Sequence, residues 1–128
     1  MSVRIVLADD HEVVRQGVRR LLEAQPSLQI CAEAANGEEA VELAVSLKPD
    51  VVILDLSMPV MNGVEATRQI RQLVPSAKII LFSMHDFSQL AESVKQAGAH
   101  AYVAKSSQVD KLYDAIRAVL SDNGAEPA

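Results

Sequence analysis

The sequence has little of what several classes of protein require. Its single cysteine, Cys31, excludes an internal disulfide framework and is typical of a reducing compartment. No apolar run approaches the ~18 residues of a membrane span, and residues 1–4 do not resemble the start of a signal peptide. We therefore expect a cytoplasmic protein without membrane segments.

Aromatic and basic residues are also scarce. Aromatic residues make up 3% of the chain and tryptophan is absent, so a surface on which nucleobases stack is not expected. The 12 lysines and arginines are outnumbered by 17 aspartates and glutamates, which leaves a net charge of −5. Because nucleic-acid binding depends on clustered positive charge, we expect no direct binding of nucleic acid by this chain.

What the sequence does contain is a regular alternation of short apolar runs and longer segments with helical spacing. The expected strands are 3–8, 28–33, 51–54, 78–83 and 101–104. The apolar faces expected for the helices that follow them are Val14, Val18, Leu21 and Leu22; Ala40, Leu43, Ala44 and Leu47; Ala66, Ile70, Leu73 and Val74; Phe87, Leu90, Ala91 and Val94; and Val109, Leu112, Tyr113, Ile116, Val119 and Leu120.

Strand and helix thus alternate five times along the 128 residues. Connections of this length join parallel strands through right-handed crossovers, which predicts an α/β fold, a doubly wound sandwich. We expect one domain over residues 1–121 and a tail or the start of a linker over 122–128.

Smaller signals mark individual elements. Asn36, followed by Glu39, predicts the start of a helix, and Gly98 predicts the end of another. Arg15 and Arg19, with Arg20, give the first helix a basic face. We interpret that face as solvated, and selection of a protein partner is the alternative.

Polar side chains follow several of the expected strands. Asp9 and Asp10 follow the first strand, Asp55 follows the third, Ser83 ends the fourth, and the fifth leads to Lys105. Because the carboxyl ends of parallel strands meet at one edge of a sheet, where ligands bind, we expect these side chains to lie together.

Such a cluster suits a cation and a phosphoryl group. Two carboxylates about 4 Å apart repel by roughly 4 kcal/mol at an effective dielectric constant of 20, and a divalent cation removes that repulsion. Oxygen ligands without histidine or thiol favour Mg²⁺. A metal, a hydroxyl and an ammonium group together suit a small dianion, and Asp55 is then a candidate to accept it as an acyl phosphate.

Each residue alone has a simpler interpretation. Asp9 and Asp10 are the residue type that caps a helix, and Asp55 is the type that follows a strand in a turn. Lys105 alone is typical of a solvated charge. Only the joint occurrence of these residues favours a binding site.

These same segments resemble the receiver (CheY-like) domain of bacterial response regulators. The segments are Asp9-Asp10, Asp55-Leu56-Ser57-Met58-Pro59-Val60-Met61-Asn62-Gly63, Ser83, and Ala101-Tyr102-Val103-Ala104-Lys105. Residues 81–86 are further similar to receivers of LuxR-type transcriptional regulators, the NarL/FixJ subfamily, and the resemblance extends from Val3 to about Leu120. It implies a flavodoxin-like (βα)5 fold with a parallel sheet in the order 2-1-3-4-5.

The resemblance also implies roles for residues at the edge. Asp55 would accept a phosphoryl group from a sensor histidine kinase, as part of a two-component system. Asp10, Asp55 and the backbone carbonyl of Ser57 would hold Mg²⁺, and Asp9 would support it through water. Lys105 would pair with the phosphoryl oxygens.

The same family is switched by phosphorylation. Ser83 would swing toward the phosphoryl group and Tyr102 would change rotamer with it, which alters the surface of the fourth helix, fifth strand and fifth helix. LuxR-type regulators bind DNA through a C-terminal helix-turn-helix, so the output is expected outside this chain. A homodimer could form through the last helix or through the switch surface, and the sequence does not select between them. Because Ser106 rather than a proline follows Lys105, there is no basis to expect a cis peptide there.

Two other classes of function remain as alternatives. An aspartyl-nucleophile phosphatase normally has a second carboxylate two residues after the nucleophile, where this chain has Ser57. A phosphate-independent interaction module would keep the fold without using the acidic residues. We expect no enzymatic activity beyond the chain's own phosphorylation and dephosphorylation.

Overall fold

The computed structural model describes residues 2–83, 91–104 and 109–125 of the chain. The strands of this described part are β1 (Val3–Ala8), β2 (Leu28–Ala34), β3 (Val51–Leu54), β4 (Lys78–Ser83) and β5 (Ala101–Ala104). Its helices are α1 (Glu12–Glu23), α2 (Gly37–Leu47), α3 (Gly63–Leu73), α4 (Ala91–Ala97) and α5 (Val109–Ala125). The predicted strands therefore all form, and β2 continues one residue further than expected.

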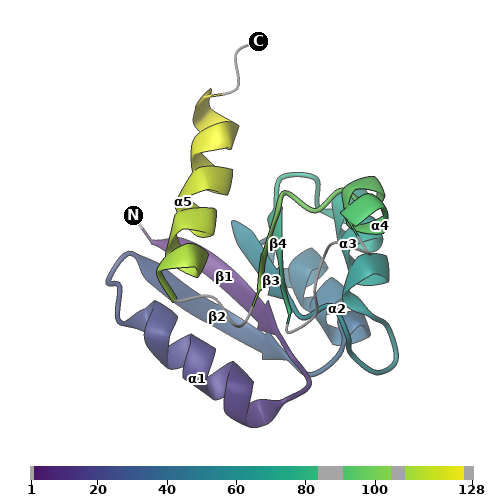
Figure 1. Ribbon diagram of the computed structural model, residues 1–128, viewed down its shortest axis with the longest axis horizontal. Coiled ribbons are helices and arrows are strands. Elements are labelled where there is room, and N and C mark those ends of the chain that lie inside the picture. Colours follow the sequence, from purple (N-terminus) through teal and green to yellow (C-terminus); the bar gives the residue numbers. More distant parts are fainter. Residues whose placement is uncertain (1, 84–90, 105–108, 126–128) are drawn as a thin grey trace.

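The strands make one parallel sheet in the order β2-β1-β3-β4-β5, covered by helices on both faces (Figure 1). Helices α1 and α5 pack on one face, and α2, α3 and α4 pack on the other. Strand β2 pairs with one side of β1, whereas β3 and the later strands lie on the other side of β1. Strands β1 and β3 are therefore neighbours within the sheet. The predicted fold class and strand order are confirmed.

The core consists of two apolar layers separated by the sheet. Successive residues of a strand point to opposite faces, so each buried strand supplies both layers. In β3, Val51 and Ile53 face α1 and α5, while Val52 and Leu54 face the other helices, and all four are fully buried. This explains why the run is continuously apolar rather than alternating.

The helix-end signals are confirmed. The side chain of Asn36 accepts a hydrogen bond from the backbone N–H of Glu39 at 2.9 Å, and the carboxylate of Glu39 accepts one from the N–H of Ala35 at 2.8 Å. Gly98 follows α4 with φ of 97°, in the left-handed region that glycine adopts without strain.

Parts of the expected helix faces are wrong. Val14 and Leu21 of α1 are 37% and 48% exposed, and Leu73 of α3 is 56% exposed. Helix α1 lies over the edge of the sheet, where only a narrow stripe of its surface meets the strands. Val18 and Leu22, one helical turn apart, form that stripe.

Helix α5 is 17 residues long and continues through Ala125, past the domain boundary expected at residue 121. Residues 122–125, expected as part of a tail or the start of a linker, belong to this helix. Across the parts of the chain that the structure describes, no helix is long and apolar enough to cross a bilayer.

Gly63 allows the loop after β3 to fold back on its own start. Its N–H donates to the carbonyl of Leu56 at 2.9 Å, and a Cβ at this position would lie 2.4 Å from the carbonyl oxygen of Asp55. Real side chains do not tolerate such a contact with backbone. The glycine is thus required for the loop that begins at Asp55.

We expect Gly63→Ala to lower the free energy of unfolding by about 1–3 kcal/mol, because the added methyl group forces the loop apart. Gly17 in α1 is the matched control, since no atom lies within 4 Å of a Cβ built there. Gly17→Ala should raise the free energy of unfolding by up to about 1 kcal/mol through helix propensity. Urea denaturation measures both, and equal effects of the two substitutions would contradict the steric account.

Candidate functional site

The acidic residues meet where β1 and β3 end. The strands pair up to Ala8 and Leu54, and the N–H of Asp55 then donates to the carbonyl of Ala8 at 2.9 Å. This contact places Asp55 beside Asp9 at the carboxyl edge of the sheet. The two aspartates are 5% and 3% exposed, so both acidic residues are buried at this edge.

Three carboxylates and an imidazole share one small space. One ligand atom from each of Asp9, Asp10, Asp55 and His11 lies within 4.8 Å of the others. Opposite ligands of an octahedral Mg²⁺ ion are about 4.2 Å apart, so small movements bring these oxygens into range. The predicted carboxylates are thus brought together, and their chemistry fits a hard divalent cation.

His11 was absent from the expected set, and the expectation of a cluster without histidine is wrong. Its Nδ1 lies 3.2 Å from an oxygen of Asp10 and 3.4 Å from one of Asp9, while most of the ring is exposed. The Asp9 carboxylate accepts the N–H of His11 at 2.9 Å, which turns the chain and brings the ring back. The structure also places His11, rather than an aspartate, at the N-cap of α1.

The remaining predicted residues lie around this cluster. Ser57 is exposed in the loop after β3, and Ser83 is fully buried at the end of β4. The register of β3 with β4 places Ser83 one residue further along the edge than Asp55. Lys105 and the peptide to Ser106 lie outside the described residues.

Tyr102 lies on β5, the edge strand, and is 43% exposed. It lines an open hollow of about 450 Å³ together with residues of α5, among them Lys111 and Asp114. Ser83 and Tyr102, the two residues expected to move together on phosphorylation, therefore lie on neighbouring strands. Ser83 is a buried hydroxyl at the end of β4, and Tyr102 is a partly exposed tyrosine on β5.

The loop that carries Asp55 is anchored on both sides. Leu56 and Met58 are buried in the core, and the carbonyl of Met61 accepts the N–H of Gly37 at the start of α2, at 3.0 Å. Val60, between these anchors, has φ of 68° and is 76% exposed. A β-branched residue in the left-handed region is strained, so the anchors hold the loop in a conformation that Val60 does not favour.

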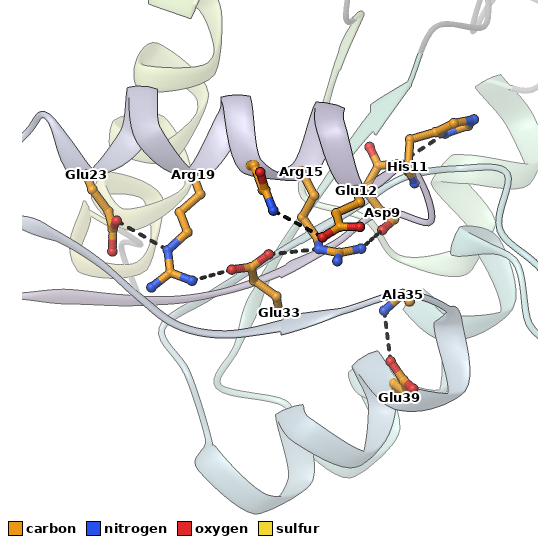
Figure 2. A network of polar contacts seen from close by, with 10 residues as sticks. Asp9, His11, Glu12, Arg15, Arg19, Glu23, Glu33, Ala35 and Glu39 are labelled. Carbon is orange, nitrogen blue, oxygen red and sulfur yellow. Dashed lines mark hydrogen bonds and ion pairs between the residues drawn. The ribbon is translucent and has the colours of Figure 1, made fainter.

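An ion-pair network joins the acidic cluster to α1 and β2 (Figure 2). The guanidinium of Arg15 donates through Nε to Glu33 at 2.8 Å and through a terminal nitrogen to the carbonyl oxygen of Asp9 at 2.6 Å. Arg19 donates to Glu33 as well, and to Glu23 at 3.3 Å. The interpretation of a solvated basic face is therefore wrong for Arg15, whose side chain is 16% exposed. Arg19 is paired but 44% exposed, and Arg20 is exposed as expected.

These contacts determine the charge state of Glu33. Partial burial raises the pKa of its carboxyl group, but the hydrogen bonds from Arg15 and Arg19 outweigh that effect and hold the pKa below its ordinary value. The hydrogen bond to Glu33, supported by the one to Glu23, raises the pKa of Arg19. Glu33 is thus a carboxylate at neutral pH and a firm partner for both arginines.

Comparison with known proteins identifies the class that this sheet and acidic edge define. Residues 5–117 match the family described as the response regulator receiver domain. The chain belongs to that family, as the resemblance in the sequence implied. It is a receiver domain of the kind found in two-component response regulators.

Two curated relatives are transcriptional regulatory proteins. The chain is 44% identical over 116 residues to the transcriptional regulatory protein LiaR of Bacillus subtilis, which covers 91% of the chain and 55% of LiaR. It is 39% identical over 124 residues to DegU of Brevibacillus brevis, covering 97% of the chain and 52% of DegU. The chain thus spans about half the length of these curated relatives.

The fold matches solved structures equally well. A LuxR-family two-component response regulator from Aurantimonas sp. SI85-9A1 superposes with a TM-score of 0.90 at 45% identity, covering 94% of this chain and 86% of that one. Receiver domains of response regulators are generally not enzymes, and in this family an acidic pocket typically binds Mg²⁺.

The network predicts how stability depends on pH. Because the pKa of Glu33 is depressed in the folded state, its ion pairs stabilise the fold fully above the ordinary value of 4.5 and lose this effect as the pH falls through the folded value. We expect Glu33→Gln to lower the free energy of unfolding by about 1–2 kcal/mol at neutral pH. The difference from wild type should shrink toward zero well below pH 4.5 in urea denaturation.

Glu23→Gln is the control for this measurement. Its carboxylate is 40% exposed and contacts Arg19, so its effect at neutral pH should be much smaller. A Glu33→Gln difference that is the same at neutral and acidic pH would contradict the ion-pair account.

Proposed function

We propose that Asp55 is the phosphoryl acceptor of this receiver domain and that a sensor histidine kinase is its donor. The observation that carries the proposal is the position of Asp55, 5% exposed among three further groups with ligand atoms within 4.8 Å of one another. Carboxylates gathered at a buried edge repel one another, and such a cluster suits a divalent cation and the transfer of a dianion to a metal-bound site.

The reaction is a displacement at phosphorus. A carboxylate oxygen of Asp55 forms a bond to the phosphorus of a phosphohistidine, the P–N bond breaks, and the imidazole leaves with that electron pair and takes up a proton. The product is an acyl phosphate on Asp55. Gly63 and the anchored loop hold the Asp55 backbone still during this approach.

The acidic residues would hold Mg²⁺ during transfer. Asp10, Asp55 and the backbone carbonyl of Ser57 are the proposed ligands, with Asp9 acting through water. When bound, the ion neutralises charge on the carboxylates and on the phosphoryl oxygens.

The proposed response lies on the neighbouring strands. Ser83 donates its hydroxyl to the phosphoryl group, with Lys105 pairing to another oxygen, and Tyr102 changes rotamer as Ser83 moves. The position of Ser83, one residue further along the same edge than Asp55, and the 43% exposure of Tyr102 on the next strand support this, because Ser83 lies near the acidic edge and Tyr102 has room to turn. The affected surface is that of α4, β5 and α5.

The proposed output lies outside this chain. Because the matched relatives are transcriptional regulators about twice as long as this chain, we propose that a DNA-binding domain follows the receiver and that residues 122–128 lead to it. The receiver, residues 1–121, would act in the cytoplasm without catalysing reactions other than its own phosphorylation and dephosphorylation. Homodimerisation on the switch surface or α5 is part of this proposal.

We expect the protein to gain the mass of one phosphoryl group when incubated with a small acyl phosphate or phosphoramidate and Mg²⁺. The gain should be lost in Asp55→Asn, because an amide does not form the acyl phosphate, and should stop when a chelator removes the metal. Intact-protein mass spectrometry measures it.

Asp50→Asn is the matched control, since Asp50 precedes the other end of β3 and accepts the N–H of Arg4 at 2.9 Å. It should be phosphorylated like wild type. Equal mass gain in Asp55→Asn and wild type would refute the assignment of Asp55. No gain with either donor would favour a phosphate-independent module, and sustained release of many phosphates per chain would favour a phosphatase.

A further inference from the structure

One guanidinium joins three parts of the molecule next to the acidic site. Arg15 extends from the first turns of α1 and contacts Glu33 on β2 and the main-chain carbonyl that follows β1, that of Asp9 (Figure 2). Its side chain is 16% exposed, and the carboxylate that holds it is 22% exposed. The contact is therefore largely withdrawn from solvent and is not a surface ion pair of negligible effect.

The carbonyl that Arg15 binds belongs to the peptide unit between Asp9 and Asp10. A peptide unit is planar, so holding its carbonyl oxygen also fixes the orientation of the N–H of Asp10 and limits where the Asp10 side chain points. The N–H of Asp9 donates to Ala34 of β2 at 3.0 Å, which fixes the preceding peptide. Arg15 continues that restraint by one residue, beyond the end of the strand.

We propose that Arg15 is a positioning residue that orients the Asp9–Asp10 peptide so that both carboxylates face the metal site, with Glu33 holding the guanidinium in place. This inference rests on the metal site of the proposed function. Arg15 acts through Asp9 and Asp10 rather than by touching the metal or the phosphoryl group.

A bulge in β2 brings Glu33 to this position. Opposite successive residues of β1, the register passes from Ile30 to Ala32, which leaves Cys31 as an extra residue. Because side chains alternate between faces, the extra residue reverses the facing of those that follow. Glu33 therefore pairs with Leu7 and lies on the face that α1 covers, within reach of Arg15.

Positioning and simple electrostatics predict opposite results when the arginine is removed. A positive charge beside the site repels a cation, so its loss should tighten Mg²⁺ binding if charge alone matters. If Arg15 orients the carboxylates, its loss should weaken binding, since removing groups that orient metal ligands typically lowers affinity by roughly 10–100-fold.

The test is a calorimetric titration of Mg²⁺ into the unphosphorylated protein, with thermal unfolding measured in parallel. We expect Arg15→Met to weaken Mg²⁺ binding by roughly tenfold, at the low end of effects on groups that orient ligands. Arg19→Met is the matched control, because it also removes one arginine from Glu33, but the guanidinium of Arg19 binds Glu33 and Glu23 rather than the Asp9 carbonyl. Binding should then stay within about twofold of wild type, since screening weakens the effect of a more distant charge.

Arg15→Lys covers the case in which Arg15→Met does not fold. Lysine keeps the charge and most of the aliphatic stem but lacks the planar fork that reaches two acceptors at once. Weaker Mg²⁺ binding in Arg15→Lys, with a melting temperature near that of wild type, would support the proposal. Unchanged or tighter binding in either folded Arg15 variant would overturn it.

Asp10→Ala in the same titration separates this inference from the proposed function. If Asp10→Ala binds Mg²⁺ as tightly as wild type, the proposed metal site itself is wrong. If Asp10→Ala loses binding while the Arg15 variants retain it, the metal site stands and only the positioning role of Arg15 fails.

Discussion

The hydrogen bond from the N–H of Asp55 to the carbonyl of Ala8 continues the pairing of β1 with β3 past the last paired residues. It brings Asp55 level with Asp9 at the edge of the sheet, although 46 positions separate them in the chain. Every proposed role at the site depends on that alignment, because carboxylates on strands that were not neighbours would be too far apart to share an ion. The adjacency of β1 and β3 follows from the reversal of strand order after β2.

Concentrated negative charge at one edge opposes folding, so the rest of the domain must supply the stability. The strands that carry the site are buried on both faces, and their apolar side chains form two layers rather than one. The charge is therefore confined to the ends of strands whose middles are among the most buried parts of the chain. The positive charge of Arg15 reaches the cluster from the side, already paired with Glu33.

The sequence predicted the strands closely, because continuous β-branched runs such as residues 51–54 occur where both faces are covered. That the carboxylates lie together at one edge could be predicted from the strand order alone. The helix faces were harder to predict: Leu73 has the spacing of a core residue, yet the sheet does not reach it. His11 and Arg15 were missed because their contacts depend on a turn and a bulge, and the departure from alternation at Ile30-Cys31-Ala32 was the available signal for the bulge.

That bulge, rather than the sequence of β2 alone, determines which side chain meets the arginines. If β2 kept all its residues but paired regularly with β1, Ala32 would lie opposite Leu7, and Glu33 would lie opposite Ala8 and turn toward α2. Deleting the extra residue Cys31 would instead restore regular alternation and leave Glu33 opposite Leu7, on the face that α1 covers. The acid therefore reaches α1 at a spacing of three residues from Ile30 only because of the bulge, whereas a regular strand would place it there at a spacing of two.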